Sequence, residues 1–167
     1  MLLTLQVLAV FLMAVAMSMA LAHALEFPGK RRLDERTYFA VQAIYYPGFT
    51  LGGIGEPLAA FATLILLLVM RDRSAAFWWI FTAFIAVVAM HAVFWFVTQP
   101  TNRYWMKNQQ LGATGAKFFS VDQAKAQGTD DGNPEWKRLR NRWEYSHIVR
   151  AALAVIGLIA LTIAVAS

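Results

Sequence analysis

Six ionisable residues of this chain lie within or beside long apolar segments, where ionisable groups are rare. They include all three histidines and three of the five glutamates: His23, Glu26, Glu56, His91, Glu144 and His147. An ionisable side chain inside a bilayer is costly unless it is paired or ligated, so each of these residues marks a candidate functional site.

The spacing of two pairs indicates metal chemistry. His23-x-x-Glu26 and Glu144-x-x-His147 each place an imidazole and a carboxylate one helical turn apart on one face. A Glu-x-x-His pair combined with single carboxylates from partner helices is typical of dinuclear metal sites in four-helix bundles. The six residues together therefore predict a dinuclear site for iron, copper, manganese or zinc.

A purely structural polar network is the alternative explanation of the same residues. Arg150 lies one turn beyond His147 and could pair with Glu56, while His91 could form a hydrogen bond between helices. His23 and Glu26 would then lie at the headgroups. Glu144 would be a helix N-terminal charge favoured by the dipole. Haem ligated by two histidines is a further alternative, although an apolar haem slot would not need so many glutamates.

Composition indicates which elements position these residues. Of the 167 residues, 59% are hydrophobic and 15% charged, against roughly 45–50% and 25% in soluble domains. Four segments reach the length of about 20 residues that a membrane-spanning helix needs: residues 2–24, 49–70, 75–97 and 143–166. We predict an all-α integral membrane four-helix bundle, with residues 1–167 as a single domain and residues 98–142 as a long extramembrane loop.

The first segment has an alternative interpretation as a cleaved signal peptide, because Ala22-His23-Ala24 resembles a cleavage site. No Lys or Arg precedes the apolar run, however, and the run is longer than that of a signal peptide. We therefore expect this segment to be a membrane-spanning helix.

The positive charges predict an orientation. Four spans place both termini on one face, and 13 of the 15 Lys and Arg lie outside the short turn at residues 71–74. Nearly all of the 13 are in or beside the two long connections, so the positive-inside rule makes that face cytoplasmic and both termini extracytoplasmic. The net charge of +5 is thus a topology signal, and we expect no nucleic-acid partner. The absence of cysteine excludes thiolate ligands and thiol nucleophiles.

The six ionisable residues are expected at similar depths. With a rise of about 1.5 Å per residue, Glu56 and His91 lie roughly 10 Å and 9 Å from the cytoplasmic ends of their spans. The other four lie closer to the same ends, so all six belong to the cytoplasmic half. Phe94-Trp95-Phe96 could line an aromatic pocket near His91. Glycines preceding Glu56 and Pro57 predict an irregular helix that faces protein or ligand.

Three stretches resemble a known family. They are Gly53–Pro57, the run from His91 to Trp95 followed by Pro100-Thr-Asn102-Arg103-Tyr-Trp105, and Arg142-Trp143-Glu144-Tyr-Ser-His147-Ile-Val-Arg150. Together they resemble the anthrone-oxygenase-like family of small four-helix membrane proteins. The resemblance implies an oxygenase that inserts one atom of dioxygen into an activated aromatic ring, giving a quinone, without dissociable flavin or haem.

The resemblance also implies roles for individual residues. His147 or His91 would deprotonate the substrate, with Glu144 orienting the base. Asn102, Trp105 and Arg150 would position the substrate or stabilise its anion. Cofactor-free chemistry differs from the metal site predicted by spacing, and both remain open at this point.

The sequence therefore predicts a membrane-embedded oxidoreductase, an oxygenase acting on a lipophilic aromatic or quinone-like compound. Its expected contacts are membrane lipid and that small molecule, with other membrane subunits or further copies of the chain as additional partners. The alternatives are a non-catalytic subunit of a larger membrane complex, and a haem-binding, quinone-binding or proton-relay protein.

Overall fold

The computed structural model describes residues 2–70, 75–106, 111, 113–121 and 135–167, and its regular elements there are helices. Four segments are long and apolar enough to cross a membrane: Leu2–Lys30, Gly48–Val69, Ala75–Met106 and Trp136–Ala166. The chain is thus an all-helical, multi-pass membrane protein, as predicted.

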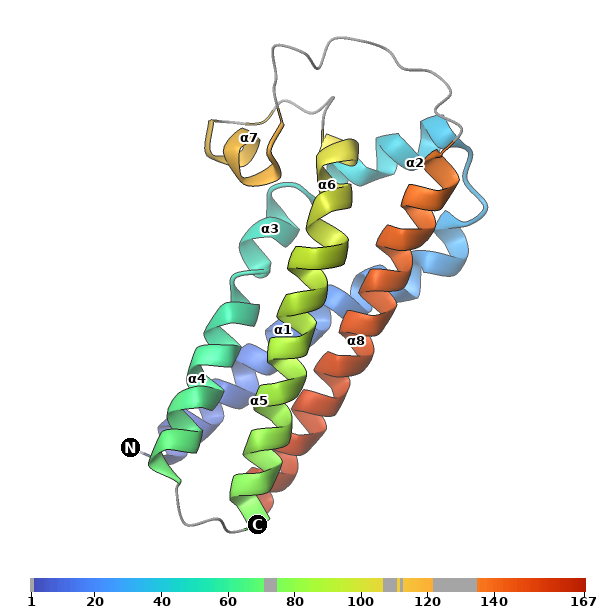
Figure 1. Ribbon diagram of the computed structural model, residues 1–167. Helices are drawn as coiled ribbons and strands as arrows, with labels where there is room; N and C mark the ends of the chain where they lie inside the picture. The colour runs from blue at the N-terminus through green and yellow to red at the C-terminus, as the bar shows by residue number, and fades with distance from the viewer. Residues whose placement is uncertain (1, 71–74, 107–110, 112, 122–134) are drawn as a thin grey trace.

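The long helices form a four-membered bundle (Figure 1). Helix α1 (Leu2–Lys30) and helix α5 (Ala75–Val93) each pack against both α4 (Gly55–Val69) and α8 (Trp136–Ala166). Both termini lie at one end of the bundle. The short helices gather at the other end: α2 (Glu35–Gln42), α3 (Gly48–Gly52), α6 (Gln99–Met106) and α7 (Ala113–Phe119).

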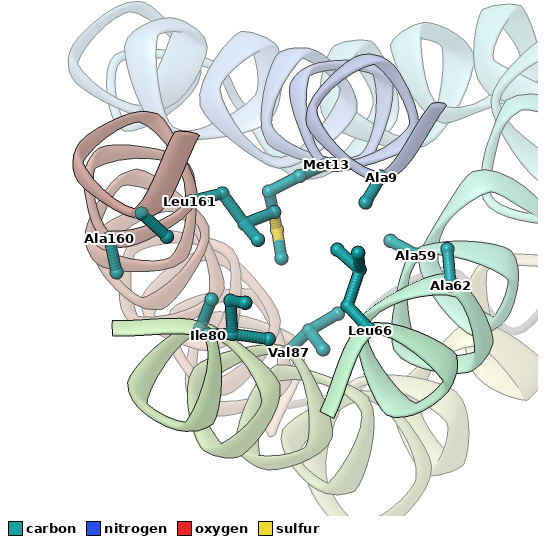
Figure 2. Close-up of a cluster of buried hydrophobic side chains, with 11 residues drawn as sticks. Ala9, Met13, Ala59, Ala62, Leu66, Ile80, Val87, Ala160 and Leu161 are labelled. Carbon is teal, nitrogen blue, oxygen red and sulfur yellow. The ribbon is translucent and has the colours of Figure 1, made fainter. Parts of the chain in front are cut away.

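Small side chains fill much of the bundle core, which Figure 2 shows along the helix axes. Alanines from all four long helices meet there, among them Ala9, Ala59, Ala83 and Ala160, beside larger side chains such as Leu66. Small residues let membrane helices approach closely. Van der Waals contacts then stabilise the bundle, because the hydrophobic effect does not drive helices together inside a bilayer. The core between these helices is therefore closely packed, and polar groups gather nearer the end that carries the short helices.

The helices extend further than the predicted spans. The third segment continues as a helix to Met106, and α8 begins at Trp136, so both ends of the expected loop at residues 98–142 are helical. A π-helical turn, η2 (Phe94–Thr98), joins α5 to α6, and such turns are frequent at functional sites. Pro100 has no N–H for the carbonyl of Phe96, and the Arg142 guanidinium donates to that carbonyl instead, at 3.1 Å.

The predicted irregularity near Glu56 is confirmed. Helix α3 ends at Gly52 and α4 begins at Gly55, with α1 packed tightly against both. A Cβ atom at Gly52 would lie 2.7 Å from the Met19 sulfur, and one at Gly55 would lie 3.0 Å from Val15. Because glycine at these positions allows the close approach, Glu56 enters the bundle in the first turn of α4.

Helix α2 lies across the end of the bundle and begins with a side-chain cap. The Asp34 carboxylate accepts a hydrogen bond from the Thr37 N–H at 2.8 Å, and this bond lowers the pKa of Asp34. Tyr38 and Gln42 are four residues apart and both are buried. The 3-10 turn η1 (Ala43–Tyr45) then directs Tyr45 inward.

Candidate active site

A cavity of about 430 Å³ lies at the end of the bundle that carries the short helices. Aromatic rings form much of its wall: Tyr45, Tyr46, Phe49, Phe94, Trp95, Trp105, Phe118, Phe119 and Trp143. Polar and charged side chains also reach it: His23, Gln42, Glu56, His91, Asn102, His147 and Arg150. An aromatic pocket with a few converging polar groups is the usual form of a small-molecule site.

The cavity gathers most of the predicted site residues. His147, His91, Asn102, Trp105 and Arg150 all line it, whereas Glu144 does not. Of the predicted metal ligands, His23, Glu56, His91 and His147 line the cavity, and Glu26 and Glu144 lie outside its wall.

Glu56 links two of these groups. Its Oε2 accepts from Arg150 Nη2 at 2.6 Å, and its Oε1 lies 2.9 Å from His91 Nδ1. The carboxylate is 3% exposed, so the pair with Arg150 is buried. The Arg150 guanidinium also lies over the Phe94 ring, 5.1 Å from its centroid. Both bonds of Glu56 are those expected if these residues form a structural polar network.

The hydrogen bonds of His91 define its tautomer. Trp95 Nε1 donates to His91 Nε2 at 2.9 Å, and an indole N–H can only donate. The proton of the neutral ring is then on Nδ1, where it is donated to Glu56. Both nitrogens of His91 are therefore engaged.

His147 has a different arrangement. Its Nδ1 lies 3.0 Å from the carbonyl oxygen of Trp143, which can only accept, so Nδ1 carries the proton. Nε2 is then the acceptor nitrogen, and the hydrogen bond of this ring to a described residue is the one made by Nδ1. The His23 ring lies beside it, with centroids 4.3 Å apart. Two neighbouring imidazoles thus line the cavity, and the lone pair of His147 is on Nε2.

The indole of Trp143 is fixed by Asn102. Trp143 Nε1 donates to Asn102 Oδ1 at 2.7 Å, and Asn102 Nδ2 donates to Gln99 at 3.0 Å. Because the Trp143 carbonyl accepts from His147, this chain of bonds connects α6 to the imidazole. Gln42 and Trp105, by contrast, each keep a buried side-chain N–H without a hydrogen-bond partner among the described residues.

A second network lies behind the cavity wall. Lys30 is 4% exposed, and its Nζ lies 2.9 Å from Glu26 Oε2 and 3.7 Å from Glu144 Oε1. Tyr38 donates to Glu144 at 2.9 Å, and Tyr45 donates to Glu26 at 2.5 Å. Burial, together with the neighbouring carboxylates, raises the pKa of both phenols.

The six predicted metal ligands are thus divided between two networks. Among the described residues no group of three or more His, Asp or Glu side chains is arranged to hold a metal ion, so the predicted dinuclear site is not shown and stays a prediction. Glu144 bonds to Tyr38 and does not orient His147; the Trp143 carbonyl has that position. Glu144 also lies more than two turns inside α8, so its interpretation as a helix N-terminal charge is wrong.

Sequence reasoning missed four residues of the site: Lys30, Tyr38, Gln42 and Tyr45. Lys30 follows Glu26 by four residues and so shares its helix face, which is the sequence signal for their pairing. The spacing of Tyr38, Gln42 and Tyr45 also follows one helix face. That pattern predicts an inward-facing surface, although it does not say which groups the surface meets.

Four apolar helices around an aromatic cavity with two adjacent imidazoles define a multi-pass membrane protein with a candidate small-molecule site. The chain belongs to the anthrone oxygenase family, whose model matches residues 49–160. This confirms the resemblance, and the family's name indicates oxygenase chemistry. No curated protein and no solved structure matches the chain.

Proposed function

We propose that this protein is a membrane-embedded oxygenase that oxidises a lipophilic anthrone-type aromatic with dioxygen. The observation that carries the proposal is the state of His147 in the cavity: Nδ1 is bonded to a backbone carbonyl, and among the described residues this is the hydrogen bond that the imidazole makes. Family membership supports the same class of reaction.

His147 acts as the general base. Its Nε2 lone pair removes a proton from the carbon to be oxidised, and the Trp143 carbonyl stabilises the resulting imidazolium through Nδ1–H. His91 is less suited to this role because Trp95 already donates to its Nε2. His91 instead acts as a positioning residue for Glu56.

Arg150 stabilises the substrate anion. It lines the cavity, and its Nε has no hydrogen-bond partner among the described residues, while Nη2 is bonded to Glu56. Gln42 and Trp105 supply two more unpaired N–H groups in the same wall. Since a buried unpaired donor costs about 1–3 kcal/mol, a bound oxygen atom that accepts from these groups would be favoured.

The reaction balances with dioxygen as the only oxidant. A ring CH₂ loses two hydrogens and gains a carbonyl oxygen, giving the quinone, and the second oxygen atom leaves as water. Four electrons pass from the carbon to dioxygen. The base is needed first, because the carbanion is far more electron-rich than the neutral ring.

Oxygen uptake and quinone formation test the proposal directly. Purified protein in lipid nanodiscs is supplied with anthrone under air, and anthraquinone is measured by chromatography. Replacing His147 with Ala should lower kcat by about 10²-fold or more. Tyr145→Phe is the matched control, because Tyr145 is 52% exposed and does not line the cavity. Wild-type turnover by a folded His147→Ala protein would reject His147 as the base.

The orientation forms part of the same proposal. Both termini lie at one end of the bundle and the cavity at the other, so the positive-inside rule places the cavity at the cytoplasmic side. In this proposal residues 1–167 act as one domain. A reporter fused after Ser167 should be active only outside the cytoplasm; cytoplasmic activity would reverse the orientation.

A further inference from the structure

The cavity wall differs between its buried part and its exposed part. The buried lining residues include His23, Gln42, Glu56, His147 and Arg150. The exposed lining residues are mostly apolar, among them Leu51 at 63%, Ile54 at 52% and Trp95 at 46%, while Thr114 on α7 is an exposed polar one. The cavity therefore has its charged groups in the buried part of the wall and an apolar exposed edge at Leu51, Ile54 and Trp95.

This apolar edge lies on the side of the bundle. Leu51 and Ile54 belong to the candidate span Gly48–Val69, and Trp95 belongs to Ala75–Met106. Ile54 stands at the break between α3 and α4, where the helix is interrupted. Exposed apolar side chains on membrane-spanning segments face lipid, because water would not solvate them favourably.

Helix α7 covers the end of the cavity. Gly115 packs so closely against Tyr46 that a Cβ atom would lie 2.5 Å from its hydroxyl oxygen. Gln99 Nε2 donates to the Phe118 carbonyl at 2.6 Å, and Phe119 is buried. Figure 1 shows α7 beyond α3, at the end of the bundle away from the termini. Among the described residues, α7 therefore covers part of the aqueous end of the cavity, and the apolar edge at Leu51, Ile54 and Trp95 lies on the side of the bundle.

We propose that the gap bordered by Leu51, Ile54 and Trp95 is a portal through which an aromatic substrate dissolved in the bilayer enters the cavity sideways. The substrate enters with its oxygen-bearing end first, because the donors are deepest in the cavity. Its apolar end remains between Ile54 and Trp95. This inference rests on the proposed function for the identity of the substrate, but the position of the portal does not.

Single cysteines test the position of the portal. The chain contains no cysteine, so Ile54→Cys in lipid vesicles carries one thiol. An alkyl maleimide dissolved in the bilayer should label it at least about tenfold faster than a sulfonated maleimide in water. Leu58→Cys is the lipid-facing control, and Lys117→Cys on α7 is the aqueous control. Faster labelling of Ile54→Cys by the sulfonated reagent would overturn the portal.

Protection of the portal thiol by bound anthrone gives a second measurement. Leu58 is 46% exposed on the same helix face as Ile54, one turn away, and does not line the cavity. Anthrone should therefore slow the labelling of Ile54→Cys and leave Leu58→Cys unchanged. Equal rates with and without anthrone at Ile54→Cys, in protein that oxidises anthrone, would overturn the portal.

Kinetics provide the third arm. Ile54→Trp narrows the opening and should lower kcat/KM about tenfold, mainly through KM, whereas Leu58→Trp should change it less than about twofold. Equal effects of the two substitutions would contradict the portal.

The maleimide comparison needs no turnover. If it gives the expected labelling rates but the protein does not oxidise anthrone, the proposed function is rejected and the portal is retained. Aqueous labelling in an active protein would reject the portal alone.

Discussion

Arg150 Nη2 on α8 lies 2.6 Å from Glu56 Oε2 on α4, so a buried ion pair joins two helices whose paired residues are 94 positions apart in the chain. The other oxygen of the same carboxylate bonds to His91 on α5. One glutamate thus connects three of the four long helices at the cavity wall. Changes at this residue should therefore affect both stability and the site.

Neutralising Glu56 should be strongly destabilising. Glu56→Gln leaves the Arg150 charge uncompensated in a buried position, which costs about 3–5 kcal/mol. The double variant Glu56→Gln, Arg150→Met should recover much of that loss, because no unpaired charge remains. Thermal unfolding in detergent measures the stability of the single and the double variant. Equal stability of the single variant and the wild type would show that the pair is not needed for folding.

The buried Lys30 should matter far more than its exposed neighbour. Lys30→Gln leaves Glu26 and Glu144 without their cation, and the expected loss of about 3 kcal/mol follows from the unpaired buried carboxylate Glu144. Arg32→Gln is the control, since Arg32 is exposed and surface changes stay within about 0.5 kcal/mol. Chemical unfolding compares the two, and indistinguishable midpoints would contradict the burial of Lys30.

The contact between α7 and Tyr46 should respond to a single methyl group. In Gly115→Ala the new Cβ meets the Tyr46 hydroxyl at 2.5 Å, so α7 must shift away. Hydrogen exchange of α7 amides should rise, and KM should increase. Adding Tyr46→Phe removes the clashing oxygen and leaves the ring carbon at 3.1 Å, so it should restore part of the wild-type exchange. Faster exchange in the double variant than in Gly115→Ala would refute this explanation.

Tyr38 should make the protein sensitive to alkali. Burial, then the charge of Glu144, raises the pKa of Tyr38 above its usual value of about 10. The phenol stays protonated in the folded state while it ionises in the unfolded chain, so stability is fully present below about pH 10 and falls as pH rises above it. Unfolding midpoints across that range should show the decline.

Tyr38→Phe separates the two contributions of this residue. At neutral pH it removes the donor to Glu144, so stability should fall by about 1–3 kcal/mol. Above about pH 10 the decline should be shallower than in the wild type, because one ionising phenol is gone. An unchanged alkaline slope would assign the sensitivity to other groups.

Much of the fold could be predicted from local sequence. Apolar segments of spanning length predict the four long helices, since a bilayer requires that backbone polar groups be satisfied within each helix. Counting residues from the span ends also placed Glu56 and His91 at similar depths, and they do meet, at 2.9 Å. The Glu56–Arg150 pair belongs to the structural interpretation of these residues, in which Arg150 lies one turn beyond His147.

How the polar residues are divided between the cavity and the second network could not be predicted from local sequence. Spacing places Glu144 and His147 on one helix face, yet the fold directs Glu144 to Tyr38 and leaves His147 beside His23. Partner choice depends on how α2 docks across the bundle end. That docking is decided by contacts distant in sequence, as between Tyr38 and Glu144, 106 positions apart.

The sequence by itself determined that this is a helical membrane protein with its ionisable groups in one layer, because both follow from length, hydropathy and helical rise. Only the tertiary structure decided which of those groups share a cavity. It placed α7 and the Gly52–Gly55 break in the wall of one cavity and bonded only Nδ1 of His147 to a described residue. These contacts depend on how side chains of different helices pack in three dimensions, and the periodicity of one helix gives no information about that packing.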